Sequence, residues 1–253
     1  MEKPIVFKNK RGKQLVGVLH LPKGKRKFPL LLICHGFGST KTRRKYVKLA
    51  RALTKRGIAT FRFDFEGCGD SEGSFETITI KRQVSDLVSA AEYVLRQKNI
   101  NKNKIALLGS SLGSVIVALF TAQSKFPAKT LVFWAPAFNQ EKLFSIWHTK
   151  STLRKWKRQG YFIRKDKKFG ISYLRENEKK DYTPILSQVR VPILIIHGKK
   201  DETVPLKFSK KLAKDYKNIK LVLYPTDHKF EDYYIQQKLI RDTTRWLNRH
   251  LRK

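Results

Sequence analysis

The chain has 253 residues, 41% of them hydrophobic, which is enough for one large domain with a sizeable core. Its 55 lysines and arginines against 20 aspartates and glutamates give a formal net charge of +35, which can attract nucleic acid, an anionic membrane or an anionic substrate. Two cysteines, Cys34 and Cys68, exclude a dense disulfide framework. Neither a secretory signal nor the roughly 20 apolar residues of a membrane-spanning helix can be recognised, so these features together predict a cytoplasmic protein.

Apolar runs alternate with helical patterns along the chain, and this alternation predicts βα units that form a mostly parallel sheet. Several of the apolar runs are continuous in Val, Ile and Leu, as expected for strands that helices cover on both faces. We therefore expect an α/β fold with a sheet of about eight strands. The expected strands span 5–8, 14–20, 29–34, 58–63, 104–108, 130–134, 192–197 and 219–224, and the expected helices span 44–56, 80–97, 112–123, 206–216 and 232–251.

Residues 137–182 interrupt the alternation and are rich in both aromatic residues and lysines. Segments this long without an assigned element usually have structure and a function. We predict that 137–182 form a small cap inserted into a core made of 1–136 and 183–253. Trp147 and Trp156 are the candidates for binding substrate beneath it. The alternative is a set of helices that merely cover an edge of the sheet.

The sequence Gly109-Ser110-Ser111-Leu112-Gly113 matches the G-x-S-x-G pattern of a nucleophile elbow. It stands between an apolar run and an apolar helical pattern, which predicts the strand–turn–helix context that the motif requires. Glycines suit this place because the turn is strained and closely packed. Ser111 is therefore the candidate nucleophile, with its hydroxyl exposed at the tip of the turn.

A second match to the same pattern, over 69–73, lacks this context. Three further residues separate it from the preceding apolar run, and no apolar helix follows it promptly. A carboxylate beside its serine, Ser71, would also oppose the oxyanion that acyl transfer must stabilise. The sequence therefore favours Ser111 over Ser71.

A serine hydroxyl needs a base, and histidine suits this role because it titrates near neutral pH. Sites in an open parallel sheet gather at the carboxyl ends of strands. Of the six histidines, the three at or just after the ends of expected strands are therefore the candidates: His35, His197 and His228. Where a nucleophile elbow of this type supplies the serine, the acid and then the base follow it along the chain. Only His228 can then be the base, and Asp201, in the loop after the preceding strand, supplies the acid. Asp227 is a rival acid, although a neighbour in sequence seldom reaches back to the adjacent ring. A metal site built from His197, Asp201 and His228 is a further, weaker alternative.

Acyl transfer also needs two backbone N–H donors for the tetrahedral intermediate. The N–H of Leu112 directly follows the nucleophile, and the N–H of Phe37 lies in the loop after the strand at 29–34. Glycines on both sides of Phe37 let the backbone approach the substrate oxygen. His35 then organises this loop and is not a base.

These features resemble the α/β-hydrolase superfamily over nearly the whole chain. The most similar members are small cap-bearing esterases of the cinnamoyl/feruloyl-esterase and serine-aminopeptidase-like branch. The resemblance implies a Ser111–His228–Asp201 triad that hydrolyses carboxylic esters through an acyl-enzyme, and a structural loop over 64–73. Ser110 and Ser114 depart from the family, in which many members have His and Gly at these places. The segments that carry the resemblance are 35–37, 63–73, 109–113 and 196–205.

Three functions remain in competition. The first is a serine esterase for small, medium or aromatic acyl esters that needs no cofactor and no metal. The second is a thioesterase or peptidase of the same fold that acts on an anionic substrate. The third, a binder of nucleic acid or of an anionic membrane, rests on the charge of +35 alone, and no recognised nucleic-acid module supports it. Because the lysine-biased charge is spread along the chain, a solvated surface is favoured over a specific anion patch.

Overall fold

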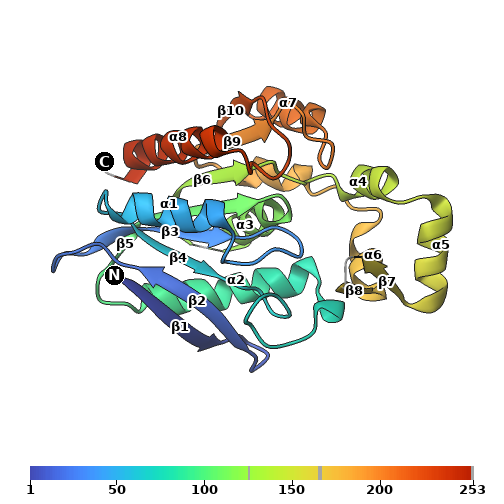
Figure 1. Ribbon diagram of the computed structural model, residues 1–253, viewed down its shortest axis with the longest axis horizontal. Helices are drawn as coiled ribbons and strands as arrows, with labels where there is room; N and C mark the ends of the chain where they lie inside the picture. The colour runs from blue at the N-terminus through green and yellow to red at the C-terminus, as the bar shows by residue number, and fades with distance from the viewer. Residues whose placement is uncertain (125, 165–166, 252–253) are drawn as a thin grey trace.

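The computed structural model describes residues 1–124, 126–164 and 167–251. An eight-stranded sheet in the order β1-β2-β4-β3-β5-β6-β9-β10 lies at its centre (Figure 1). The pairs β1–β2 and β2–β4 are antiparallel, and the other neighbouring pairs are parallel, which confirms the expected mostly parallel sheet. Its strands are β1 (Glu2–Lys8), β2 (Gln14–His20), β3 (Phe28–Cys34), β4 (Ala59–Phe63), β5 (Ile100–Ser110), β6 (Ala128–Trp134), β9 (Ile193–Gly198) and β10 (Ile219–Tyr224).

Helices cover both faces of this sheet (Figure 1). Helices α1 and α8 contact each other over one face, and α2 and α3 contact each other over the opposite face, where α7 also packs. The helical patterns in the sequence therefore correspond to real helices with boundaries within a few residues. Their bounds are α1 (Arg44–Thr54), α2 (Ile80–Leu95), α3 (Leu112–Gln123), α7 (Leu206–Asp215) and α8 (Tyr233–Leu251).

The side chains of β3 show why the strand is a continuous apolar run. Leu30 and Leu32 belong to the core beneath α2 and α3, whereas Leu31 and Ile33 belong to the core beneath α1 and α8. Successive side chains of a strand point to opposite faces, and each of these four exposes at most 1% of its surface. Burial on both faces therefore favours an apolar residue at each of these positions of β3.

Residues 137–182 stand beside the carboxyl ends of the parallel strands (Figure 1). An aromatic cluster fills their interior, in which Trp156 stacks on Phe162 with ring centroids 5.2 Å apart and Phe144 packs 6.2 Å from Trp156. Their assignment as a separate cap stays a prediction, and residues 165 and 166 lie outside the described part. The elements of this segment are α4 (Gln140–Trp147), α5 (Lys150–Gln159), the antiparallel pair β7 (Tyr161–Arg164) and β8 (Lys167–Gly170), and α6 (Ile171–Asn177). A 3₁₀ helix, η2 (Thr183–Gln188), follows the segment.

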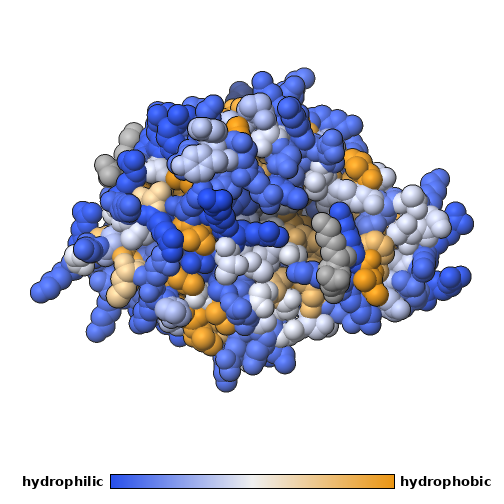
Figure 2. Space-filling model, in the orientation of Figure 1, coloured by the Kyte–Doolittle hydropathy of each residue, from blue (hydrophilic) through white to orange (hydrophobic). Residues whose placement is uncertain are grey.

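The face of the molecule seen in Figure 2 is mostly hydrophilic, with small separate hydrophobic patches. Large hydrophobic side chains that are more than half exposed include Val6, Ile163 and Tyr234. Within the residues that the structure describes, none of the helices combines the length and apolar character needed to cross a membrane.

His20, at the end of β2, is a buried titratable group that makes folding depend on pH. It exposes 1% of its surface, and its Nε2 accepts a hydrogen bond of 2.9 Å from Arg62 Nε. Burial, together with the Arg62 guanidinium, lowers the pKa of His20 from 6.5 to about 4. Below pH 6.5 the unfolded chain therefore binds a proton that the folded chain does not. We expect this group to lower the free energy of unfolding by about 3 kcal/mol as the pH falls from 6.5 to 4.

Urea unfolding of the wild type and of His20→Gln across this pH range measures the effect. The glutamine oxygen can accept the same hydrogen bond but does not titrate, so the variant should lose stability less steeply in acid. Titrating groups that do not interact with His20 contribute equally to both proteins and cancel in the difference. Parallel pH profiles for the two proteins would contradict this assignment.

Candidate active site

Ser111 sits at the sharp turn between β5 and α3. Its backbone has φ 54° and ψ −118°, a conformation that is costly for a residue with a side chain and is typical of functional sites. The next helical turn has no room for a side chain, since a Cβ on Gly113 would lie 2.5 Å from the carbonyl oxygen of Cys34. The Ser111 N–H donates to the Trp134 carbonyl at 2.8 Å, which ties the turn to β6. The half-buried serine is thus held at the tip of a nucleophile elbow.

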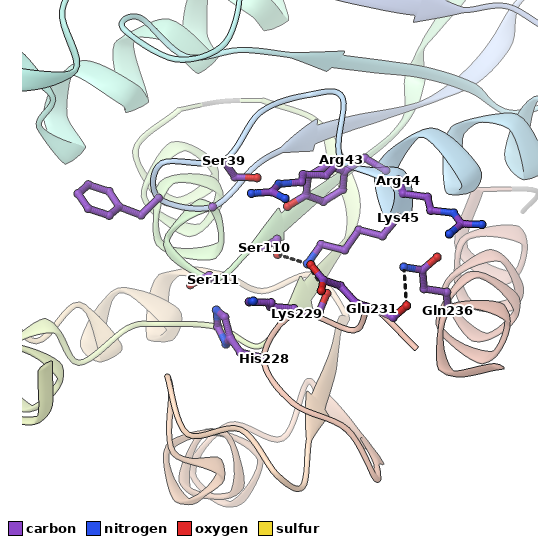
Figure 3. A pocket seen from close by; sticks show the side chains of 13 residues that line it. Ser39, Arg43, Arg44, Lys45, Ser110, Ser111, His228, Lys229, Glu231 and Gln236 are labelled. Carbon is purple, nitrogen blue, oxygen red and sulfur yellow. Dashed lines mark hydrogen bonds between the residues drawn. The ribbon is translucent and has the colours of Figure 1, made fainter. Parts of the chain in front are cut away.

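His228 lies in the loop after β10 and lines the same cavity as Ser111. In Figure 3 the two side chains point toward one another across this cavity. His228 Nδ1 lies 2.7 Å from Asp201 Oδ2. Because a carboxylate oxygen can only accept, Nδ1 carries the proton and Nε2 is left with a free lone pair. Nε2 is the atom that a general base would use toward the serine.

Four groups hold the Asp201 carboxylate in place. One oxygen accepts hydrogen bonds from the N–H groups of Thr203 and Val204, at 2.9 and 2.8 Å. The other lies 2.7 Å from His228 and 3.1 Å from His197. Burial alone would raise the pKa of Asp201, but hydrogen bonds from His197, His228 and Val204 hold this pKa well below its usual range. The group is therefore an anion that can fix and stabilise a protonated His228.

His197, at the end of β9, supports Asp201 from behind and is fully buried. Its Nε2 lies 2.9 Å from the Val204 carbonyl oxygen, so Nε2 must carry a proton. Its Nδ1 lies 2.7 Å from Ser209 Oγ and can accept the hydroxyl proton. The sequence places His197 at the correct edge of the sheet but does not reveal this supporting contact, which depends on where α7 packs.

Ser71 and Asp227, the alternative nucleophile and acid, form hydrogen bonds outside the Ser111–His228–Asp201 arrangement. Ser71 is buried, and its Oγ donates to the Asp64 carbonyl at 2.7 Å while it accepts from the Val16 N–H at 2.9 Å. Asp227 is exposed, and its Oδ1 accepts the N–H groups of Lys229 and Phe230 in the turn that it begins. Among the described residues, no group of three or more His, Cys, Asp or Glu is arranged to hold a metal ion.

The residues predicted to supply the oxyanion donors lie beside the serine on two different segments. Leu112 is the first residue of α3, so its N–H has no partner within the helix. The loop that carries Phe37 lies against the elbow, because a Cβ on Gly36 would be only 3.2 Å from the Cβ of Ser111. Phe37 lines the cavity, and its ring stacks on Tyr173 of α6 with centroids 4.5 Å apart. The assignment of these two N–H groups as the oxyanion hole stays a prediction that this proximity supports.

His35 organises the same loop, in agreement with its expected role. Its Nδ1 lies 2.8 Å from the Gly36 carbonyl oxygen and therefore donates to it. Its Nε2 can then accept the Phe65 N–H at 3.2 Å. Burial lowers the pKa of His35, so the ring is a neutral link between the ends of β3 and β4.

A cavity of about 520 Å³ opens beside Ser111 (Figure 3). Neither tryptophan of the predicted substrate pair belongs to its lining. Trp147 donates from Nε1 to the Thr203 carbonyl at 2.8 Å, and Trp156 exposes only 2% of its surface inside the aromatic cluster. Their contact with substrate stays a prediction. The lining residues are Gly36, Phe37, Ser39, Arg43, Arg44, Lys45, Tyr46, Ser110, Ser111, His228, Lys229, Glu231 and Gln236.

A mostly parallel eight-stranded sheet, a strained serine between β5 and α3, and an Asp–His pair after later strands together define an α/β hydrolase. Residues 26–182 match the family described as serine aminopeptidase, S33, and the chain belongs to this family.

Several known proteins are similar to this chain, over nearly all of it or over a part of it. The structure of Est1E from Butyrivibrio proteoclasticus with ferulic acid bound has a TM-score of 0.87 and 25% identity, covering 98% of this chain and 100% of that one. Palmitoyl-protein thioesterase ABHD10, mitochondrial, from Mus musculus is 26% identical over 203 residues, which are 75% of this chain and 64% of that protein. An uncharacterized 31.7 kDa protein of the traX-finO intergenic region of Escherichia coli is 34% identical over 108 residues, 42% of this chain and 36% of that relative's length.

Proposed function

We propose that the chain is a serine hydrolase that cleaves carboxylic esters of small, medium or aromatic acyl groups through an acyl-enzyme. Ser111 is the nucleophile, His228 the general base and acid, and Asp201 the group that orients and stabilises His228. The observation that carries the proposal is the strained Ser111, at φ 54°, facing a histidine whose other nitrogen lies 2.7 Å from a buried carboxylate. Membership of a hydrolase family and similarity to Est1E support it.

The proposed reaction runs in two halves. Ser111 Oγ attacks the ester carbonyl carbon while His228 Nε2 takes the hydroxyl proton, and the N–H groups of Phe37 and Leu112 stabilise the resulting oxyanion. His228 then gives the proton to the alcohol oxygen, which leaves, and Ser111 keeps the acyl group. In the second half a water gives its proton to His228 and attacks the acyl-enzyme. Collapse of that intermediate releases the acid and returns the proton to Ser111.

A thioester is the second candidate for the scissile bond. The same triad would serve, because the acyl-enzyme is identical and only the leaving group differs. Similarity to a palmitoyl-protein thioesterase supports this alternative. Comparing kcat/KM for an oxygen ester, its thioester and its amide of the same acyl group decides among esterase, thioesterase and peptidase.

The remaining expectations accompany this proposal. We propose a small-molecule ester as the partner, cytoplasmic location, and a reaction that needs no cofactor. No specific nucleic acid is proposed as a ligand. If the charge of +35 instead serves nucleic-acid binding, a fluorescent oligonucleotide should bind at low ionic strength and dissociate steeply as salt rises.

Covalent labelling tests the nucleophile directly. We expect a fluorophosphonate probe to modify the folded protein at Ser111, because the probe reacts only with a serine that a base activates. Mass mapping of the labelled peptide identifies the residue. Labelling at Ser71, or no labelling of a correctly folded protein, would contradict the proposed mechanism.

A further inference from the structure

The cavity beside the nucleophile is lined by four basic side chains and one acidic side chain. Arg43, Arg44 and Lys45 come from the beginning of α1, Lys229 comes from the loop that carries His228, and Glu231 is the acid. Figure 3 shows Arg43, Lys45 and Lys229 reaching into the cavity, whereas Arg44 extends away from its centre. The space that a substrate would occupy therefore has a net positive lining.

Lys45 is the basic residue placed nearest to the elbow. Its Nζ lies 3.4 Å from the hydroxyl of Ser110, the residue before the nucleophile, and 3.3 Å from the carbonyl oxygen of Lys229. The ring centroids of Tyr46 and Phe230 lie 5.4 and 5.5 Å from the same atom. All of these partners are neutral. Across the ranges that the structure describes, no ion pair within 4.0 Å involves Lys45 or the other three basic residues of the lining.

Within the described residues, the Lys45 ammonium group therefore has no carboxylate oxygen within 4.0 Å. Burial, and to a smaller extent the neighbouring Arg43, lowers the pKa of Lys45 to about 8, although the more distant carboxylates of Glu231, Asp227 and Asp201 act in the opposite direction. A charged group that has lost hydration is unfavourable unless an opposite charge approaches it. An anion bound in the cavity would supply that charge, and it would do so within reach of the reacting serine.

Given the esterase function proposed above, we propose that Lys45, with Arg43 and Lys229, binds an anionic group of the substrate. The group is a carboxylate or a phosphate, carried close to the scissile ester bond. Lys45 supplies a point charge from inside the cavity, and Arg43 supplies a planar fork of donors from its rim. The chain is then a hydrolase that selects charged esters over neutral esters of the same shape.

Three phenyl butanoates of one scaffold test this selectivity. They carry a carboxylate, a phosphate or a neutral carboxamide at the position opposite the ester. Monomethyl adipate and its neutral monoamide place the charge on the acyl side. The readout is the ratio of kcat/KM between charged and neutral members. We expect the wild type to prefer at least one charged member by about tenfold or more, as for one charge-assisted hydrogen bond, and the preferred member tells carboxylate from phosphate.

Variants of Lys45 then assign the preference. Lys45→Met keeps the length of the side chain without its charge, and we expect it to lower the ratio by about ten- to one-hundred-fold. Lys45→Arg should retain most of the ratio. The control is Lys129→Met, which removes an exposed charge near the amino end of β6, whereas the cavity lies at the carboxyl ends of the parallel strands. This variant should leave the ratio unchanged.

The outcomes separate this proposal from the esterase proposal. If Ser111→Ala still turns over these esters, the proposed nucleophile is wrong. If Ser111→Ala is inactive but Lys45→Met slows charged and neutral esters equally, Lys45 only clamps Ser110 to the loop at Lys229, and the anion site is overturned. A wild type without preference for any charged ester overturns it as well. Should Lys45→Met fail to fold, Arg43→Gln at the exposed rim provides the same ratio test.

Discussion

The Ser111→Ala variant is expected to lose ester hydrolysis by about 10⁴- to 10⁶-fold in kcat. Without the hydroxyl no acyl-enzyme can form, and only substrate binding and the oxyanion donors remain. The strained backbone at φ 54° accepts alanine as readily as serine, so the fold should persist. Steady-state kinetics on 4-nitrophenyl butanoate, together with the thermal unfolding midpoint, measures both expectations.

Ser71→Ala is the matched control, because Ser71 stands in the second G-x-S-x-G match. Its hydroxyl is hydrogen-bonded to the backbone of Asp64 and Val16, so its loss should lower the free energy of unfolding by about 1–3 kcal/mol without removing activity. Substantial turnover by Ser111→Ala, or inactivity of a folded Ser71→Ala, would reverse the assignment of the nucleophile.

The sheet and the elbow could be predicted because burial on both faces forces a recognisable pattern. The run of β3 and the run that enters Ser111 are apolar because helices cover both faces of the sheet at these positions. The beginning of β5 could not be predicted in this way. This strand starts at Ile100, and its register to β3 shifts between Phe28 and Leu30. Residues 101–104, which lie at this shift, are all polar and do not alternate between apolar and polar as a half-buried strand would.

The pairing of Asp201 with His228 could also be expected from the sequence, because both lie in loops after the last two strands and the chain order of nucleophile, acid and base puts Asp201 before His228. The basic lining of the cavity could not be expected. Lys45 stands in a lysine-rich chain, where a solvated surface is the expected place for it. Only the packing of α1 against the sheet brings it beside Ser110, 65 positions further along the chain.

The aromatic cap segment illustrates a different limit. Its composition indicates a packed cluster, yet a tryptophan can face the substrate, the cluster or the core with the same sequence. Trp156 packs inward on Phe162, and Trp147 reaches the loop after β9 through Thr203. Ring direction depends on how the short helices α4 and α5 are placed, which residue spacing alone does not determine.

Replacing Asp201 by asparagine should lower kcat by about 10⁴-fold while the fold is retained. The amide nitrogen would donate to His228 Nδ1, where the carboxylate now accepts. The imidazole proton then moves to Nε2, and the ring can no longer take the proton of Ser111. Loss of the carboxylate also removes the charge that stabilises the imidazolium formed during the reaction. Steady-state rates of Asp201→Asn, together with its thermal unfolding midpoint, measure the loss of activity and the retention of the fold.

Asp227→Asn is the matched control, because it removes a carboxylate adjacent to His228 in sequence. Asp227 is exposed and accepts hydrogen bonds from the turn N–H groups of Lys229 and Phe230, and an asparagine oxygen can accept the same bonds. We therefore expect its kcat within about threefold of wild type, the change typical of a weakly coupled surface charge. A large loss in Asp227→Asn with little loss in Asp201→Asn would transfer the acid role to Asp227. Equal losses in both would mean that net negative charge near His228, and not the 2.7 Å contact, sustains catalysis.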